Sequence, residues 1–423
     1  MITNNDIPNQ KPKLFSYPWL LVGLLCVVGA LNYLDRMIIT TMRTSIVDAI
    51  PMTDAQFGLL TSVFLWIYGL LSPVAGFLAD RFNRSRVIIG SLFVWSLVTW
   101  LTSQATTFEQ LLATRALMGI SEACYIPAAL ALIVDYHKNV TKSLATGIHI
   151  AGVYVGQSLG FLGGWLAESH SWNYAFSVFG IVGISYAVVL TFLLKDAPKP
   201  QTLKVQAPKI NFGDALRQLF RQPAYLLALA AWGLLGVASW MISAWLPTYY
   251  KEAFSLTQTD AGVYATAYFY VAMFFGVLTG GALADYWSKS NPRARVLLPA
   301  ISLVLACPGI ILGGTTSILW VAVAGFMLYA FMRPFLDANM MPVLSMVSDS
   351  RYLATGYGIL NLFSCVVGGI GIYAGGTLRD ANINLSLMFQ VAALTLLVCA
   401  FLLYKIPIKN LQQTEEVPEV AAK

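Results

Sequence analysis

Long apolar segments follow one another through most of this chain, and they predict helices that cross a membrane. Each segment has roughly 20 residues or more, which is the length that a helix needs to span a bilayer. Because the hydrocarbon core holds no water, each segment has to satisfy its backbone internally, as a helix does. We predict twelve such helices, at 17–42, 56–79, 87–105, 108–136, 142–167, 172–194, 224–250, 259–286, 294–313, 317–348, 352–378 and 383–405.

The stretch between the sixth and seventh helices differs from the rest. Residues 195–223 hold Pro198, Pro200 and Pro208 with many basic residues and no spanning apolar run. They predict a cytoplasmic linker that contains a short amphipathic helix at 212–220. The linker divides the chain into an N-terminal bundle (1–194) and a C-terminal bundle (224–423) with a short cytoplasmic tail. The predicted fold class is an all-α membrane protein with twelve transmembrane helices in two six-helix bundles.

Composition and charge support a membrane protein with a defined orientation. The chain is 57% hydrophobic and 11% charged, whereas soluble domains have about 25% charged residues. Its net charge of +6 comes from Lys and Arg that fall mostly on one predicted side. Only Arg43, Lys251 and Arg379 fall on the other side, and the positive-inside rule then places both termini in the cytoplasm. We therefore expect a multi-pass protein of the cell inner membrane with the lipid bilayer as its surroundings and no nucleic-acid partner.

Neither an enzyme nor a metal or cofactor site is expected. The five cysteines lie in predicted spans without paired spacing, and a buried cysteine behaves as a small apolar residue. No soluble domain is available for a nucleophile–base set, a metal cluster or a phosphate loop. Without a Walker loop, transport would be driven by an ion gradient or be facilitated diffusion. A membrane sensor would normally carry a cytoplasmic effector domain, for which the linker and the tail are too short.

Charged residues interrupt several apolar spans, which is costly and usually functional. Asp35 and Arg36 lie within the first helix, and Arg115 and Glu122 lie within the fourth. Seven residues are close to two helical turns, so Arg115 and Glu122 share one face about 10 Å apart, and Gly119 keeps that face open. A guanidinium can grip a carboxylate through two hydrogen bonds, and a carboxyl group away from water can bind and release a proton. The set supplies the parts for anion–proton symport.

The tenth helix carries another such pair. Arg333 and Asp337 are one turn apart and can pair along one face, with Asn339 nearby and Pro334 expected to kink the helix. A second cation would suit an acidic substrate with several polar groups, and Asp337 is a further candidate for proton binding. Alternatively, the pair only neutralises itself beside the kink.

Further polar and aromatic residues within spans suggest a site for a polyol. Aromatic rings stack on the apolar faces of sugars, while amides and hydroxyls meet the hydroxyl groups. The alternative for each ring is simple packing or a position in the interfacial aromatic belt. His149 of the fifth helix is expected to be either a buried imidazole with satisfied hydrogen bonds or a proton relay. The candidates are Tyr154, Gln157, Trp240, Tyr268, Asn339 and Asn361.

The two halves of the chain contain a repeated sequence motif. Gly-Phe-Leu-Ala-Asp-Arg-Phe-Asn-Arg-Ser-Arg at 76–86 follows the second helix, and Gly-Ala-Leu-Ala-Asp-Tyr-Trp-Ser-Lys at 281–289 follows the eighth. Both keep Gly-x-Leu-Ala-Asp and place a cation four residues after the Asp. Internal repeats of this kind mark secondary transporters, whose binding site lies near the bilayer midplane.

The 76–86 segment resembles the signature loop of the major facilitator superfamily, and the weaker copy sits where that family places its second one. The resemblance covers nearly the whole chain and implies the major facilitator fold. In such transporters the Asp of this loop pairs across helices to steady the outward-open form. The resemblance implies this gating role for Asp80, Arg81 and Arg84, and for Asp285, although Tyr286 replaces the usual cation there.

Asn-Tyr-Leu-Asp-Arg at 32–36 and Arg-x6-Glu at 115–122 resemble two branches of this superfamily. One branch is the anion:cation symporters of sugar acids, and the other is the Spinster-like lipid transporters. The strings at 31–42, 64–70 and 123–128 look more like bacterial sugar-acid and sialate permeases. In the symporter branch the first-helix Arg grips the substrate carboxylate and the Asp and Glu take protons, which implies those roles for Arg36, Asp35 and Glu122, with Arg115 tuning Glu122.

The predicted function is proton-coupled import of a monocarboxylated sugar, such as sialic acid (N-acetylneuraminate) or a hexuronate, by a monomer. The alternative function is Spinster-like transport of lysolipid or another amphiphile. The alternative for the buried charges is a static network that holds the N-terminal half together, although a buried ion pair is weak evidence of stability because desolvation offsets its attraction.

Overall fold

The computed structural model describes residues 16–137, 141–197, 212–349 and 352–407. Within these ranges, twelve helical spans are long and apolar enough to cross a membrane, as predicted from the sequence. Their ends agree with the predicted ends to within a few residues. The amphipathic helix predicted at 212–220 is also present, as α10 (Phe212–Phe220), while the predicted linker residues 198–211 lie outside the described residues.

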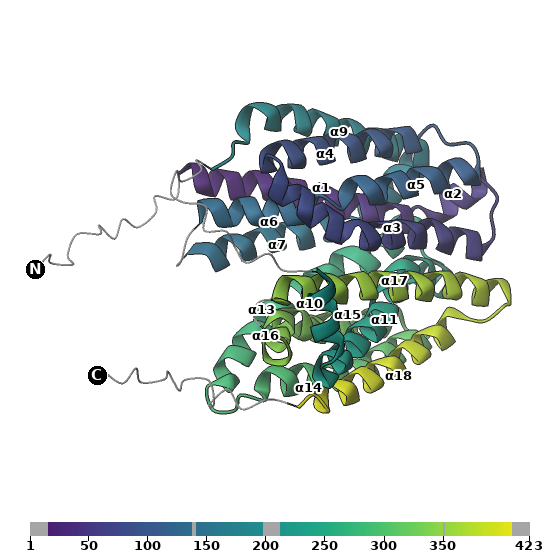
Figure 1. The fold of residues 1–423 in the computed structure, drawn as a ribbon. Coiled ribbons are helices and arrows are strands. Elements are labelled where there is room, and N and C mark those ends of the chain that lie inside the picture. Colours follow the sequence, from purple (N-terminus) through teal and green to yellow (C-terminus); the bar gives the residue numbers. More distant parts are fainter. Residues whose placement is uncertain (1–15, 138–140, 198–211, 350–351, 408–423) are drawn as a thin grey trace, which may run out of the picture.

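The helices of the first half form one group, in the upper part of Figure 1. The first span is a single helix, whereas the fourth and fifth spans are each divided in two. In chain order they are α1 (Tyr17–Thr41), α2 (Arg43–Ala49), α3 (Asp54–Arg81), α4 (Arg84–Thr102), α5 (Phe108–Glu122), α6 (Tyr125–Tyr136), α7 (Lys142–Ser158), α8 (Phe161–Ser169) and α9 (Trp172–Leu193).

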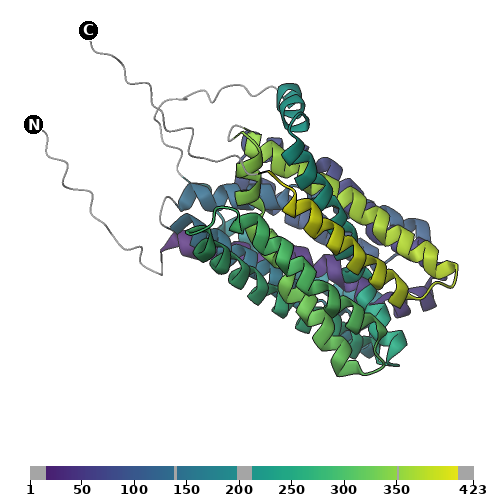
Figure 2. The same ribbon diagram turned by 90° about the horizontal axis from the view of Figure 1, so that it is seen from below.

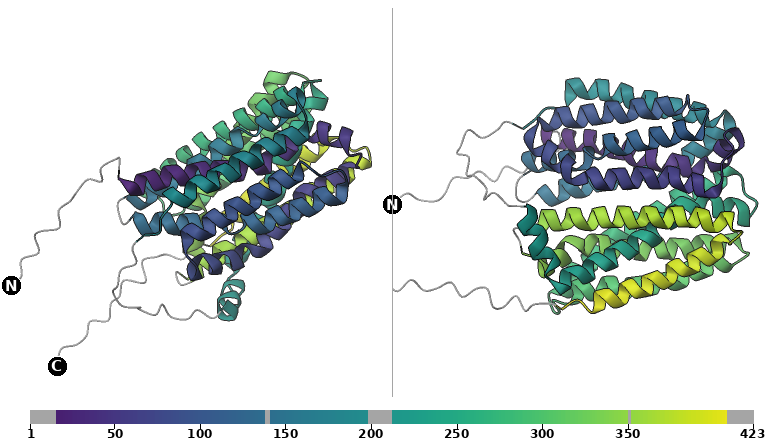
Figure 3. Two further views of the ribbon diagram at one scale, coloured as in Figure 1. Left: turned by 90° about the horizontal axis from the view of Figure 1, so that it is seen from above. Right: turned by 45° about the vertical axis from the view of Figure 1, so that its right-hand side comes forward.

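The helices of the second half lie below them in Figure 1, and the right-hand view of Figure 3 shows the same two groups. Here the eighth span contains a π-helical turn, and the tenth span is divided. Beyond α10 the elements are α11 (Pro223–Ala253), α12 (Gln258–Gly262), η2 (Val263–Tyr268), α13 (Phe269–Ser288), α14 (Ala294–Thr315), α15 (Leu319–Met332), α16 (Pro334–Val347), α17 (Leu353–Asp380) and α18 (Leu385–Tyr404).

The two groups meet along α3 and α17, which run side by side (Figure 1). Glycines allow the approach: a Cβ on Gly58 would lie 3.0 Å from the carbonyl oxygen of Ile372, and one on Gly369 would lie 2.4 Å from the Trp66 ring. Cross-group hydrogen bonds add to it, as Ser62 Oγ donates to the Gly369 carbonyl at 2.7 Å. The hydrophobic effect does not drive helices together within a bilayer, because lipid tails are as apolar as the helix surfaces. Close packing and hydrogen bonds between helices therefore hold them together.

α1 begins and α18 ends at the same end of the molecule, at the left of Figure 1. α10 lies beyond the bundle at this end, as its teal ribbon shows in Figure 2. Its Ala215 and Leu219 are buried while Gln218 and Phe220 are exposed, which is the pattern of an amphipathic helix. α10 therefore buries one apolar face against the protein at this end of the molecule.

Candidate functional site

Two spans that carry paired charges are interrupted at those charges. α5 ends at Glu122 and α6 begins at Tyr125, while α15 ends at Met332 and α16 begins at Pro334. The break at Arg333 confirms the effect predicted for Pro334, which cannot donate a backbone hydrogen bond to the helix. Transporters place their sites at such discontinuous helices because the freed backbone lines the binding region.

Arg36 and Glu122 form a buried ion pair that links α1 to the end of α5. Arg36 Nε donates to Glu122 Oε2 at 2.7 Å, and both side chains are nearly or fully inaccessible to solvent, at 3% and 0% exposed. Arg36 Nη2 also donates to Asn32 Oδ1 at 3.0 Å. A charged pair this deeply buried depends on each partner, since the removal of one leaves the other uncompensated.

Three aromatic rings surround the guanidinium of Arg36. Its Cζ lies 4.3 Å from the Tyr33 ring centre, 4.4 Å from the Tyr68 centre and 5.0 Å from the Phe64 centre. The negative faces of the rings stabilise a cation in a desolvated place. They also fix the orientation of the guanidinium plane, which prepares it to meet a carboxylate.

The remaining charges of this cluster are less fully paired. Asp35 accepts a hydrogen bond from Thr99 Oγ1 at 3.4 Å, and Arg115 lies over the Phe176 ring at 5.5 Å. Among the described residues, Nε and Nη2 of Arg115 and Oε1 of Glu122 are buried without a hydrogen-bond partner. Because buried polar atoms are nearly always hydrogen-bonded, the cluster has spare capacity for a proton, water or a ligand group.

The pairing differs in detail from the sequence-based expectation. Arg115 and Glu122 are both buried on α5, as their spacing predicted. Glu122, however, bonds to Arg36 of another helix rather than to Arg115. Asp35, Arg36, Arg115 and Glu122 thus belong to one buried cluster of two cations and two carboxylates, which is neutral when all four are charged.

A second pair lies in the other half. Arg333 forms an ion pair with Asp337, one turn further along the span, and its Nε donates to Ser239 Oγ at 3.0 Å. These side chains are more accessible than the first pair, at 15% and 24% exposed. The predicted neighbour Asn339 is fully buried and donates to the Phe335 carbonyl of its own helix at 2.8 Å.

A small cavity of about 20 Å³, enough for about one water molecule, lies between α1, α3 and α11 beside the first pair. Arg36, Thr61 and Phe64 line one wall, and Trp240 and Ser243 line the other. A cation, hydroxyls and aromatic rings converge on this cavity, and small-molecule sites have linings of this kind. Two predicted residues, Arg36 and Trp240, are brought together here.

The other predicted polyol ligands lie outside this cavity, and Tyr154 lies near Arg333 and Asp337 of the second pair. Gln157 is buried, Tyr154 and Asn361 are partly buried, and Tyr268 is 39% exposed in the π-helical turn, where it packs against Tyr264 at 5.5 Å between ring centres. His149 is fully buried, with its ring 5.9 Å from that of Tyr125. The cavity lining contains none of these, and their binding roles stay predictions.

The predicted gating residues lie near the end where α1 begins. Arg84 pairs with Asp135 of α6, and Asp285 pairs with Arg295 of α14 at 2.8 Å. Arg81 is exposed at the end of α3, and the side chain of Asp80 is outside the described part of the chain. Both observed pairs join helices of the same half, and the gating role itself stays a prediction.

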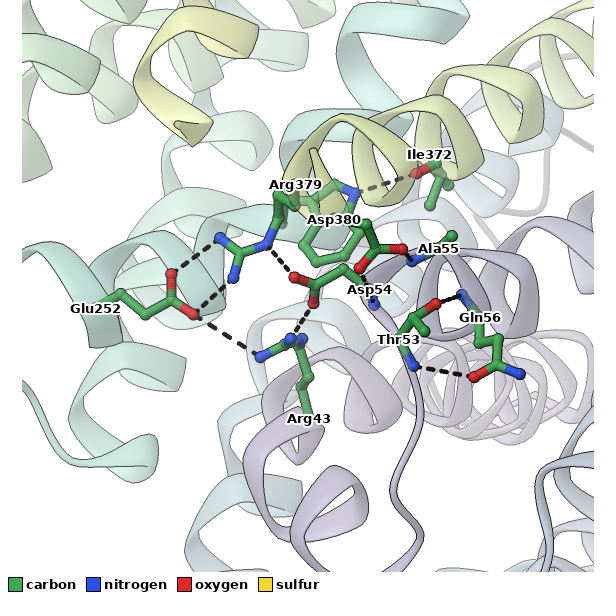
Figure 4. Close-up of polar contacts among 10 residues, drawn as sticks. Arg43, Thr53, Asp54, Ala55, Gln56, Glu252, Ile372, Arg379 and Asp380 are labelled. Carbon is green, nitrogen blue, oxygen red and sulfur yellow. Dashed lines mark hydrogen bonds and ion pairs between the residues drawn. The ribbon is translucent and has the colours of Figure 1, made fainter. Parts of the chain in front are cut away.

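Sequence reasoning missed an ion-pair network at the opposite end of the helices (Figure 4). Asp54 of α3 binds Arg43 and Arg379, and Arg379 also contacts both carboxylate oxygens of Glu252, at 2.9 and 2.8 Å. The signal that could have found it is the charge bias, because Arg43 and Arg379 are among the few cations on this side.

Comparisons with known proteins give the wider context. A family model described as Major Facilitator Superfamily matches residues 25–372 and 234–422. Protein spinster homolog 1 of Homo sapiens is 27% identical over 310 residues, which are 68% of this chain and 58% of that protein. The chain therefore spans 58% of the length of this relative.

Another relative matches nearly end to end. The probable galactarate/D-glucarate transporter GarP of Escherichia coli (strain K12) is 24% identical over 432 residues, covering 93% of this chain and 96% of that protein. Among solved structures, a bacterial homologue of the human lysosomal transporter Spinster, inward-facing and occupied, has a TM-score of 0.76 at 22% identity and covers 93% of this chain and 97% of that one. That likeness establishes the fold.

Proposed function

The chain belongs to the major facilitator superfamily, and from that premise we propose that it imports a carboxylated sugar together with a proton. It is a multi-pass membrane transporter rather than an enzyme. The substrate class that we favour is a monocarboxylated sugar, such as sialic acid or a hexuronate. The observation that supports this proposal most is the Arg36–Glu122 pair beside a cavity between the two halves.

The charge balance of the buried cluster couples proton and anion. When Asp35, Arg36, Arg115 and Glu122 are all ionised, the cluster is neutral, and a substrate carboxylate would add an uncompensated buried charge, which is costly. A proton on Glu122 removes its negative charge and releases Arg36 Nε. The substrate carboxylate can then take the place of Glu122 on the guanidinium, so proton and anion enter the site together.

Asp35 is the second candidate for the coupling proton. It is 4% exposed and accepts one long hydrogen bond from Thr99. Within the described residues no cation lies at ion-pair distance from Asp35. Asp35 adjoins Arg36 in the chain, so a proton that Asp35 takes up as the substrate binds would offset the charge of the substrate carboxylate. It would act with Glu122 in the same charge-balancing step.

The rest of the site supports a sugar. Trp240 offers an aromatic face across the cavity, and Thr61 and Ser243 offer hydroxyls, which suits a polyol. The accessible Arg333–Asp337 pair would hydrogen-bond the polar end of the substrate, with Asp337 as a further proton acceptor. We expect both termini to lie on the cytoplasmic side of the inner membrane, because Lys and Arg concentrate at the end where α1 begins.

Uptake of labelled sugar acid into proteoliposomes tests the proposal. An inward proton gradient is expected to drive accumulation above the equilibrium level, and collapse of the gradient with a protonophore is expected to abolish it. Uptake of a sugar acid that ignores the gradient would remove the symport claim. Failure of every sugar acid tested would remove the substrate class.

The second candidate function is transport of a lysolipid or another amphiphile. The resemblance to Spinster homologues favours it, as do the apolar residues Met37, Phe64 and Leu65 in the cavity wall. A thermal-shift screen of sugar acids against lysophospholipids on the purified protein separates the two. Stabilisation by lysophospholipid alone would select the second function.

A further inference from the structure

The second and eighth spans begin in the same way. α3 starts at Asp54 behind the N-cap Thr53, whose side chain accepts a hydrogen bond from the Gln56 backbone N–H. α12 starts at Gln258 behind the N-cap Thr257, whose side chain accepts from the Asp260 N–H. Thr53 and Thr257 are 204 residues apart, almost the spacing of the repeated Gly-x-Leu-Ala-Asp motifs. The two helix starts are therefore counterparts in the internal repeat.

Each of these helix starts receives a carboxylate from the opposite half. Asp380, the last residue of α17, accepts from the N–H groups of Asp54 and Ala55 at 2.8 and 2.9 Å. Glu168, near the end of α8, accepts from those of Gln258 and Thr259 at 2.5 and 3.1 Å.

The two contacts use the same atoms of the helix. In both, the carboxylate binds the first two N–H groups, which have no partner within a helix, and the N-cap threonine binds the third. The positive end of the helix dipole adds to the attraction.

The exchange between halves is reciprocal. Glu168 of the fifth span reaches the eighth, and Asp380 of the eleventh reaches the second. Both contacts lie at the end opposite the start of α1, where the network of Arg43, Asp54 and Arg379 also bridges the halves (Figure 4). The two halves are thereby joined at this end by two contacts of the same kind, with the carboxylate coming from a different half in each.

We propose that Glu168 and Asp380 are a matched pair of latch residues that hold this end of the transport path shut, and that both leave their helix starts when the path opens there. Both side chains are exposed, so water can replace each partner as the contact breaks. The net loss per contact is therefore small, which suits contacts that form and break in every transport cycle.

Distance measurements between spin labels test this directly. The labels are attached at Ala49→Cys and Ala253→Cys, which are exposed positions in opposite halves, at the end where Glu168 and Asp380 make their contacts. The partly exposed Cys26 and Cys124 are replaced by alanine, and the protein is measured in nanodiscs. Double electron–electron resonance then gives the ratio of open to closed populations at this end. It needs neither the substrate nor the coupling ion, so the outcome is independent of the function proposed above.

Glu168→Gln and Asp380→Asn are each expected to raise the open-to-closed ratio about fivefold, and the double variant about 25-fold, since the two contacts are separate. Glu109→Gln is the matched control, because Glu109 is an exposed carboxylate in the first turn of α5. Its ratio is expected to equal that of the parent protein.

A label pair within one half, Ala49→Cys with Gln104→Cys, reports any general loosening. Its distance is expected to stay constant in every variant. An unchanged open-to-closed ratio in the double variant would overturn the proposal. A rise accompanied by broadening of the within-half distance would overturn it as well, because the carboxylates would then support the fold rather than the latch.

Discussion

Replacement of Glu122 by glutamine probes the coupling step most directly. Glutamine keeps the shape of the side chain and can still accept a hydrogen bond, but it cannot neutralise the charge of Arg36. In the parent protein Arg36 Nε lies 2.7 Å from Glu122 Oε2, and both side chains are shielded from solvent. Loss of one member of a buried pair destabilises a protein by about 3 kcal/mol or more. The Glu122→Gln protein is therefore expected to unfold at a lower temperature than the parent protein.

A bound anion is expected to reverse that loss. The substrate carboxylate replaces the missing charge on Arg36, and a ligand that binds only the folded state stabilises it in proportion to its occupancy. The shift in unfolding temperature caused by the substrate should therefore be larger in the Glu122→Gln protein than in the parent. The Glu109→Gln protein, altered at an exposed position of the same helix, should match the parent.

The pH dependence of binding completes the test. Under the proposed coupling, one proton enters the parent protein with the anion, so the affinity is expected to fall by up to tenfold for each pH unit above the pH at which Glu122 is half protonated. In the Glu122→Gln protein Arg36 is always available, so the affinity should hardly change with pH. Isothermal titration calorimetry over the pH range in which the protein stays folded measures both.

Transport by the Glu122→Gln protein should lose accumulation and keep exchange. Proteoliposomes loaded with unlabelled substrate are expected to take up label by exchange, because the anion still binds and crosses. Empty liposomes with an inward proton gradient are expected to show no accumulation. Gradient-driven accumulation at the parent level, or the same pH dependence of binding in both proteins, would refute the coupling scheme.

Three further variants test other parts of the structure. Arg36→Lys replaces a planar cation held between rings by a point charge, and calorimetry is expected to show at least tenfold weaker substrate binding, about 1.4 kcal/mol or more. Trp240→Ala removes an aromatic wall of the cavity, and the KM for uptake is expected to rise about tenfold. Gly156→Ala places a Cβ 2.1 Å from the Ala30 carbonyl oxygen, whereas Gly147→Ala meets open space; only the first is expected to lower the free energy of unfolding, by about 1–3 kcal/mol.

The sequence predicts the spans well and their interruptions poorly. Hydropathy and length decide whether a segment crosses a bilayer, and all twelve spans are present. Pro334 marks one break because proline cannot continue a helix. Pro127 marks the break after Glu122 in the same way, since it has no N–H to donate to the carbonyl of Ala123, four residues before it. The extra helix α2 after the first span was not predicted. These details follow from packing between helices, which hydropathy does not report.

The candidate site could likewise be predicted only in part from the sequence. That Arg36 and Glu122 lie inside spans is evident from the chain, because charged residues stand out among apolar ones. Which partner each selects is not evident, since Arg36 and Glu122 are 86 residues apart and their contact depends on how α1 packs against α5. Arg115 was the nearer candidate for Glu122 by spacing, yet it lies over Phe176. The latch residues were missed because an exposed carboxylate at a helix end is common in any sequence.

Close packing of α1 against the fifth span connects the site to the latch. Four glycines of the fifth span leave no room for a Cβ against α1: Gly152 at Cys26, Gly156 at Ala30, Gly160 at Met37 and Gly163 at Ile38, each within 3.0 Å.

Thr41 Oγ1 also donates to the Gly160 carbonyl at 2.9 Å. Backbones in such contact cannot slide independently, because a packed interface of this kind has no free volume to absorb a shift. α1 carries Arg36, and α8 of the fifth span carries Glu168. If α1 shifts when a proton and an anion bind at Arg36, as proposed, α8 has to shift with it, and the proposed latch residue Glu168 is then coupled to the site.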